Sequence, residues 1–211
     1  MAGFFERIKN LLSTVPPEMS EEEKAEQLAR NIAQRQISEV LAREDAYVGR
    51  PDLWEGEVLQ TIDFSVEASE DERDDHEDGI VPWINLVDRE AELERLIDPD
   101  SIVLDYSNAK IVFDYPLDNP TTREISTSDE GFSRRQLIDL IGKFYEEIYD
   151  EEEASATIKT LPMSDRKIMN RNRSDGIYGI WGHDLDDIAI SGVEARRTRD
   201  GEVVLILGIE S

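Results

Sequence analysis

One stretch of the sequence, YGIWGHDLDD (residues 178–187), gathers residue types that could do chemistry. His183 is one of only two histidines in the chain, and acidic residues that include Asp184 and Asp187 follow it directly. An imidazole combined with carboxylates is an admissible ligand set for a divalent metal ion. A divalent-metal-dependent hydrolase that uses His183 with Asp184 or Asp187 is therefore one hypothesis for this protein.

The same stretch also permits a plainer interpretation, as a tight corner of the fold. His183 and Asp187 would face the same side only on a helix. Gly179 and Gly182 instead favour a turn, because glycine adopts backbone angles that other residues avoid. We expect Trp181 to fill the core and the His183 imidazole to hydrogen-bond a neighbouring strand or an aspartate. We therefore predict a tight turn whose side chains pack against the core. We expect it to hold no catalytic residue and no cofactor.

Other catalytic and metal-binding patterns are missing from the sequence. The second histidine, His76, lies in DERDDHEDG, which lacks the central glycine and final glutamate of a calcium-binding EF-hand loop. The glycine-rich phosphate loops, the serine elbow and the HExxH zinc motif are also absent. With 49 acidic residues, the choice of any catalytic carboxylate pair would be arbitrary. We therefore favour a non-enzymatic protein.

The charge of the chain restricts its partners. The 211 residues carry a formal net charge of −26, which repels phosphate backbones and disfavours direct binding to nucleic acid. Such a surface suits solubility, a high-salt environment or a basic protein partner. A third hypothesis follows, in which the chain is an acidic mimic of nucleic acid that binds basic proteins.

Cysteine and hydropathy patterns exclude further classes. There is no cysteine, so disulfides, thiolate catalysis and iron–sulfur clusters are excluded. No apolar run is long enough for a membrane span, and the first residues do not resemble a signal peptide. We expect a soluble, intracellular protein.

The first 50 residues are predicted to form an N-terminal helical arm. Phe4 and Phe5 begin an apolar helical pattern that Pro16 and Pro17 end. We expect this short amphipathic helix either to fold onto its own core or to dock on a partner or membrane surface. A second helix is expected from Ser20 to about Glu44, where Ser20 and Glu23 form a capping box.

Residues 51–211 are predicted to form one domain with an acidic loop at about 67–79. The clearest helix begins after a capping box at Ser133 and Gln136 and runs from about Arg134 to Glu153. Its far end is acidic, which is unfavourable at the negative end of a helix dipole. The other predicted elements are a strand at 58–66, a short helix at 88–97, a hairpin with its turn at 107–110, and a terminal hairpin with a two-residue turn at 200–201.

A basic stretch, SDRKIMNRNR, follows that helix. Our preferred interpretation is that its side chains cover the acidic helix end. The alternative is a loop offered to an acidic or phosphate-bearing partner. The basic residues concerned are Arg166, Lys167, Arg171 and Arg173.

Together these patterns predict an α+β fold. A small antiparallel sheet would carry a long amphipathic helix packed on one face, with N-terminal helices added. The corner at 178–187 would lead from the basic stretch back into the sheet.

The last 80 residues or so resemble a family of uncharacterised proteins of large DNA viruses, giant viruses among them. The resemblance lies in FSRRQLIDLIGKFYEEIYDEEEA, MNRNRSDG and YGIWGHDLDDIAISGV, and it ends at GIES. It covers about residues 132–211 and implies a viral setting, in the particle or in the host cytoplasm. It implies no activity, cofactor or site residue. The function we expect is that of a non-enzymatic interaction or structural protein, virion-associated or self-associating as a homo-oligomer.

Overall fold

The computed structural model describes residues 56–76 and 78–210. The predicted N-terminal helices, with Phe4 and Phe5, lie outside the described residues. The whole of the predicted N-terminal arm, residues 1–50, lies outside them as well.

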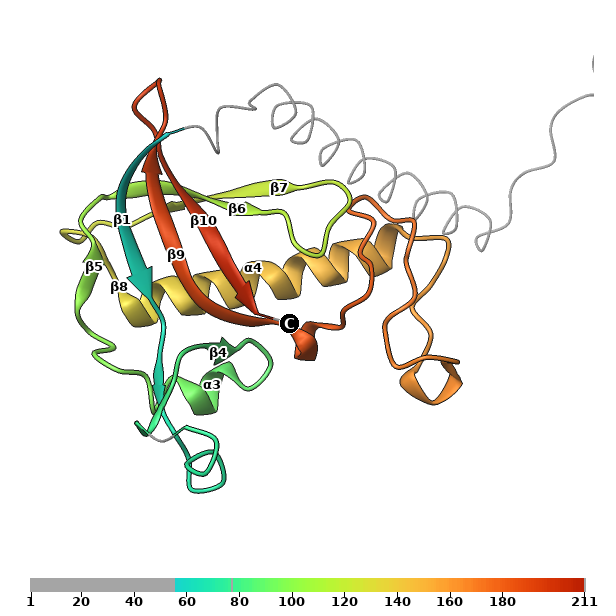
Figure 1. Ribbon diagram of the computed structural model, residues 1–211. Coiled ribbons are helices and arrows are strands. Elements are labelled where there is room, and N and C mark those ends of the chain that lie inside the picture. Colours follow the sequence, from blue (N-terminus) through green and yellow to red (C-terminus); the bar gives the residue numbers. More distant parts are fainter. Residues whose placement is uncertain (1–55, 77, 211) are drawn as a thin grey trace, which may run out of the picture. The chain divides into compact units, whose positions relative to one another are not determined.

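The described residues form ten strands and few helices (Figure 1). In chain order, the strands are β1 (Glu57–Asp63), β2 (Val66–Glu67), β3 (Ile80–Val81), β4 (Ile84–Asn85), β5 (Ile102–Leu104), β6 (Asn108–Phe113), β7 (Thr121–Ser126), β8 (Phe132–Ser133), β9 (Ala189–Arg197) and β10 (Val203–Glu210). The helices are α3 (Arg89–Glu92) and α4 (Arg134–Ser155), with short 3-10 turns η2 (Met163–Asp165) and η3 (Leu185–Asp187).

The main sheet has six strands, in the order β1-β9-β10-β6-β7, with β4 also pairing β9. Most neighbours are antiparallel, but β10 pairs β6 in parallel, with Leu205 opposite Ile111. The last strand of the chain therefore lies in the middle of the sheet. Two small two-stranded sheets, β2 with β3 and β5 with β8, complete the β structure.

The two faces of the sheet follow from the alternation of side chains along each strand. On β10, Val203, Leu205 and Leu207 point into the main core, whereas Val204 and Ile206 belong to a small apolar cluster on the other face. The inward set is continuous with the inward residues of β6 and β9. One face of the sheet thus carries the core.

Helix α4 lies along that core face (Figure 1). The predicted capping box at its start is confirmed: the Gln136 N–H donates to Ser133 Oγ at 3.2 Å, and the Ser133 N–H donates to Gln136 Oε1 at 2.8 Å. Along the buried stripe of the helix, the Tyr145 ring meets Phe113 of β6 edge-to-face at 5.0 Å. Each fully buried apolar side chain of this kind contributes about 1.5–3 kcal/mol.

The α+β prediction is wrong. The described residues are mostly β, the main sheet is mixed instead of antiparallel, and α4 is the one described helix of seven or more residues. The parallel pair of β6 and β10 explains only why the sheet was predicted to be antiparallel, because its two strands are far apart in the chain. Hairpin signals identify only neighbouring antiparallel strands.

Three local predictions also fail. The expected hairpin about residues 107–110 does not form, because β6 pairs β7 and β5 pairs β8. The helix expected at 88–97 is reduced to the four residues of α3. The terminal hairpin of β9 and β10 is present, but its loop spans residues 198–202 instead of two residues, with a positive φ at Gly201.

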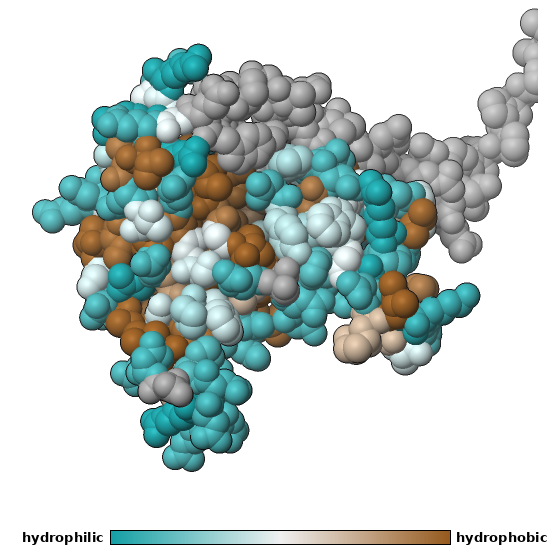
Figure 2. All heavy atoms as spheres, in the orientation of Figure 1, coloured by the Kyte–Doolittle hydropathy of each residue, from teal (hydrophilic) through white to brown (hydrophobic). Residues whose placement is uncertain are grey.

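Hydrophilic residues dominate much of the view in Figure 2. The predicted acidic loop joins β2 to β3, and its described side chains are mostly exposed or half-buried, with Ala68 buried. Within the described part of the chain, no helix has both the length and the apolar character that crossing a membrane requires.

Candidate functional site

The stretch at 178–187 forms a corner between α4 and β9. Gly179 and Gly182 both adopt positive φ angles, +66° and +76°, in the left-handed region that glycine favours. At Gly179 a side chain is also excluded by space, since a Cβ there would lie 2.7 Å from Asp118 Oδ2. Tyr178 and Ile180 are fully buried. The turn predicted from the glycines is confirmed.

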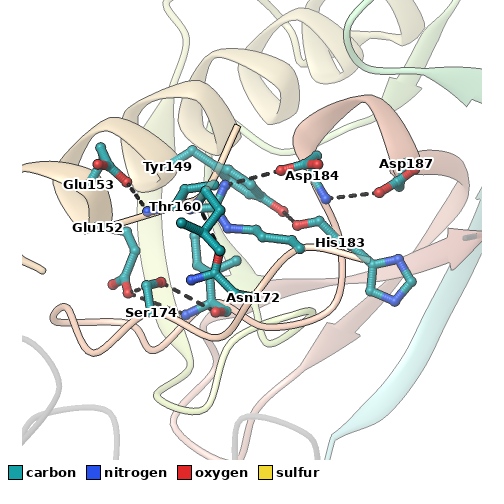
Figure 3. Close-up of polar contacts among 12 residues, drawn as sticks. Tyr149, Glu152, Glu153, Thr160, Asn172, Ser174, His183, Asp184 and Asp187 are labelled. Carbon is teal, nitrogen blue, oxygen red and sulfur yellow. Dashed lines mark hydrogen bonds and ion pairs between the residues drawn. The ribbon is translucent and has the colours of Figure 1, made fainter. Parts of the chain in front are cut away.

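The corner is organised around a buried carboxylate, Glu152 of α4 (Figure 3). Ser174 Oγ donates to Glu152 Oε1 at 2.5 Å. Backbone N–H groups of the segment 176–180 donate to the same carboxylate, at distances from 2.8 to 3.4 Å, and come from Gly176, Tyr178, Gly179 and Ile180. Neutral donors therefore surround this carboxyl group, and their hydrogen bonds shape the backbone that leads into the corner.

A buried hydrogen-bond acceptor at Glu152 was not predicted from the sequence, because the end of the helix was treated only as an acidic, exposed segment. A signal was present, because Ile141, Tyr145, Ile148 and Glu152 follow one another at spacings of four, three and four residues. That spacing puts Glu152 on the buried face of the helix. A carboxylate on an apolar helical stripe indicates donors on the packing partner.

A second polar cluster adjoins the first. Arg123 on the core face of β7 forms an ion pair with Glu151 at 3.0 Å and donates to Tyr178 Oη at 3.0 Å. The Tyr178 hydroxyl in turn donates to Glu151. Burial, followed by the hydrogen bond to Glu151, raises the pKa of Tyr178. Tyr178 therefore remains a neutral donor that links the corner to the sheet and to α4.

Asp184 is held by two arginines of the basic stretch. Arg166 forms a two-pronged ion pair with its carboxylate, and Arg171 lies 3.5 Å from Asp184 Oδ1. The hydrogen bond from Arg166 lowers the pKa of Asp184. The Arg171 guanidinium also lies 5.0 Å above the ring centre of Tyr149.

These pairs correct the expected charge match. Arg173 pairs with Asp118, and Arg166 and Arg171 pair with Asp184, so these arginines bind inside the chain but not at the acidic end of α4. At that end, the amides around Glu152 and Arg123 beside Glu151 are donors, and so are the Lys159 ammonium and the Thr160 N–H, both to Glu153.

His183 contacts other aromatic rings. Its Nε2 lies 2.7 Å from the hydroxyl oxygen of Tyr115, and its ring centre lies 6.0 Å from that of Trp181. Trp181 is 38% exposed, so the expectation that it fills the core is wrong. The prediction that His183 hydrogen-bonds a strand or an aspartate is also wrong, since its partner is the Tyr115 hydroxyl.

The predicted metal ligands do not converge as a set. Carboxylate oxygens of Asp184, Asp186 and Asp187 approach one another within 4.8 Å, but the His183 imidazole points away from Asp184 (Figure 3). Arg166 already engages both oxygens of Asp184, and Asp187 accepts the Asp184 N–H at 2.9 Å. This pattern closes the turn η3. An ion would have to displace Arg166, and metal-dependent hydrolysis stays a prediction without further support.

The segment 157–173, named here the basic loop, projects from the domain between α4 and the corner (Figure 1). Side chains fix its base: Asn172 accepts from the Leu161 N–H at 2.8 Å and donates to the Lys159 carbonyl at 3.2 Å. Asp175 accepts from the Ile158 N–H at 2.6 Å, and Arg166 donates to the Leu161 carbonyl at 2.8 Å. The loop is therefore ordered by its own contacts.

The basic loop also exposes large apolar side chains, and Figure 2 shows brown and tan spheres beside teal ones where the loop projects at the lower right. Their exposure ranges from 46% to 83%. They are Ile158, Leu161, Met163, Ile168 and Met169. The loop has five basic residues and one acidic residue, so its charge is opposite to that of the chain.

Comparison with protein families, with curated proteins and with solved structures finds no match to this chain.

Proposed function

We propose that this is a non-enzymatic interaction protein whose basic loop binds a protein partner with acidic and apolar side chains. The observation that carries the proposal is the exposure of five large apolar side chains on a loop whose base is held by hydrogen bonds. A cluster of exposed apolar residues with polar neighbours is typical of a protein interaction site.

The order of the loop favours binding. A loop that is already held in one conformation loses little conformational freedom when a partner docks, so more of the contact energy appears as affinity. Arg166 provides part of this order, because it joins the Leu161 and Met169 carbonyls to Asp184. Burying an exposed apolar side chain contributes up to about 1.5–3 kcal/mol.

The charge of the loop selects the partner. Arg166, Arg171 and Arg173 are engaged by aspartates within the chain, whereas Lys167 is exposed. A local excess of positive charge on a chain of net charge −26 attracts an acidic surface over short range and orients it towards the loop. The viral setting implied by the resemblance is part of the proposal.

A double variant, Ile168→Ser with Met169→Ser, tests the role of the loop. Proteins retained by the wild-type chain from the source cells are identified, and each is purified and tested again as a single binding partner. We expect the true partner to bind the double variant at least about tenfold more weakly, a loss of about 1.4 kcal/mol. Ile102→Ser is the matched control, because Ile102 is similarly exposed on β5.

Unchanged unfolding curves must accompany the loss of binding. Equal affinity of the wild type and the double variant for every purified partner would contradict the proposal. Binding to vesicles of anionic lipid that depends on Ile168 and Met169 would assign the loop to a lipid surface and also contradict it.

A further inference from the structure

We infer that a second copy of this chain is the partner: the basic loop of one copy binds an acidic and apolar surface that the other copy carries on its β2–β3 hairpin. This inference rests on the proposed function, because it names the surface that the basic loop contacts.

The acidic surface combines the two side-chain types that the basic loop requires. Its apolar residues are Ile80 on β3, and Trp83 and Val87 in the segment that follows the hairpin, which are 36% to 52% exposed. Its exposed carboxylates lie on the hairpin loop before Ile80, at Glu70, Asp71, Asp74, Asp75 and Asp78. The sequence 67–78 has eight acidic residues and one arginine, a composition opposite to that of the basic loop.

This surface is also ordered by its own contacts. Glu72 accepts from the Ser69 N–H at 2.8 Å and from Arg95 at 2.8 Å, which ties the hairpin loop to the segment after α3. The His76 ring meets Trp83 edge-on at 5.5 Å. Because of the backbone hydrogen bond from Ser69, the pKa of Glu72 is lowered to about 2. The apolar residues and the carboxylates are therefore presented together on a defined surface.

The two surfaces cannot satisfy each other within one copy. Figure 1 shows the β2–β3 hairpin at the bottom left of the domain and the basic loop at the lower right, with the corner between them. Both project from the body of the domain. A second copy can bring its hairpin to the basic loop of the first.

The contact joins unlike surfaces, and this restricts the assembly. A pairing of two basic loops, or of two acidic hairpins, would bring like charges together and cost free energy. Loop-to-hairpin contact is possible in a reciprocal dimer with two such contacts, or in a head-to-tail ring or filament. In each of these assemblies, every contact uses one basic loop and one acidic surface.

This property gives a specific test by complementation of purified variants. The loop variant carries Ile168→Asp and Met169→Asp, and the hairpin variant carries Trp83→Asp and Val87→Asp. We expect the wild type to associate, and each variant to be monomeric alone in size-exclusion chromatography with light scattering. Mixed together, the variants retain one intact loop and one intact acidic surface, so we expect a one-to-one dimer.

A charge variant covers the case in which replacing Trp83 impairs folding. Asp74→Lys with Asp75→Lys changes only exposed side chains and should also give a monomer that the loop variant restores to a dimer. Ile102→Asp is the control that should associate like the wild type. Association of the wild type should weaken at least about tenfold when the salt concentration is raised from about 0.1 to 1 M, because screening shortens to about 3 Å.

Two results would overturn the inference. One is a wild-type chain that is monomeric at the highest soluble concentration, and the other is a mixture of the two variants that stays monomeric. If the wild type is monomeric but a purified heterologous protein still needs Ile168 and Met169, the proposed function stands and only the identity of the partner is wrong. If no partner needs them, both proposals fail.

Discussion

Two carboxylates define the corner, and the molecule stabilises them differently. Glu152 is fully buried, and the donors to it among residues 56–76 and 78–210 are neutral groups, namely Ser174 Oγ and backbone amides. Asp184 is partly exposed and is held by the guanidinium groups of Arg166 and Arg171. One site therefore depends on the fixed geometry of the backbone, and the other on charge.

The difference shows which part of the corner is rigid. Backbone donors around Glu152 cannot separate from it without unfolding the segment 174–180, since they belong to the chain that the carboxylate organises. The arginines around Asp184 are side chains on the basic loop, and water and salt compete for their contacts. We therefore expect the Glu152 end to resist changes of solvent and the Asp184 end to respond to them.

The largest expected effect is that of Glu152→Ala. It leaves several buried donors without an acceptor, at about 1–3 kcal/mol for each group that water cannot reach. We expect the free energy of unfolding in urea to fall by about 3 kcal/mol or more. Glu147→Ala is the control on the exposed face of α4 and should stay within about 0.5 kcal/mol of wild type. A loss as small as that of the control would show that the amides find other acceptors.

A smaller effect is expected for Asp184→Asn. The amide cannot pair with two guanidinium groups, and we expect a loss of about 1 kcal/mol because solvent screens part of the interaction. The loss should shrink in 1 M salt, whereas that of Glu152→Ala should not. Equal salt dependence of the two variants would remove the distinction between the two ends.

The smallest effect is the dependence of stability on acid. The pKa of Asp184 is lowered from 3.8, mainly by the hydrogen bond from Arg166, so its contribution is complete above about pH 4 and is lost as pH falls through the lowered pKa. We expect the unfolding free energies of wild type and Asp184→Asn to converge below pH 4. The pKa values of Glu72 and Asp175 are also lowered, so the free energy of unfolding should still fall with falling pH in both the wild type and the variant. Parallel curves would contradict this prediction.

Short-range patterns explain what could be predicted from the sequence. The capping box at Ser133 and the turn about Gly179 and Gly182 depend on residues a few positions apart, and both are present. The pairing of β6 with β10 depends on strands that the chain separates widely, and no local pattern reports it. The main sheet was predicted to be antiparallel, instead of mixed, for that reason.

The candidate site divides in the same way. The basic residues and the aspartates of the corner could be recognised by type, but the pairing of Arg166 with Asp184 depends on the path of the loop between them. The periodicity of α4 placed Glu152 on the buried face, yet its donors are backbone amides, which every sequence contains. Their direction is set by the conformation of the segment 174–180 and cannot be read from residue types.

The central place of β10 in the sheet has a consequence for biosynthesis. β10 joins β9 on one side to β6 on the other, so none of the earlier described strands links the two halves of the sheet. The edge of β6 that pairs with β10 lacks this partner strand until Val203–Glu210 has been synthesised. Folding of this domain should therefore follow its translation instead of accompanying it.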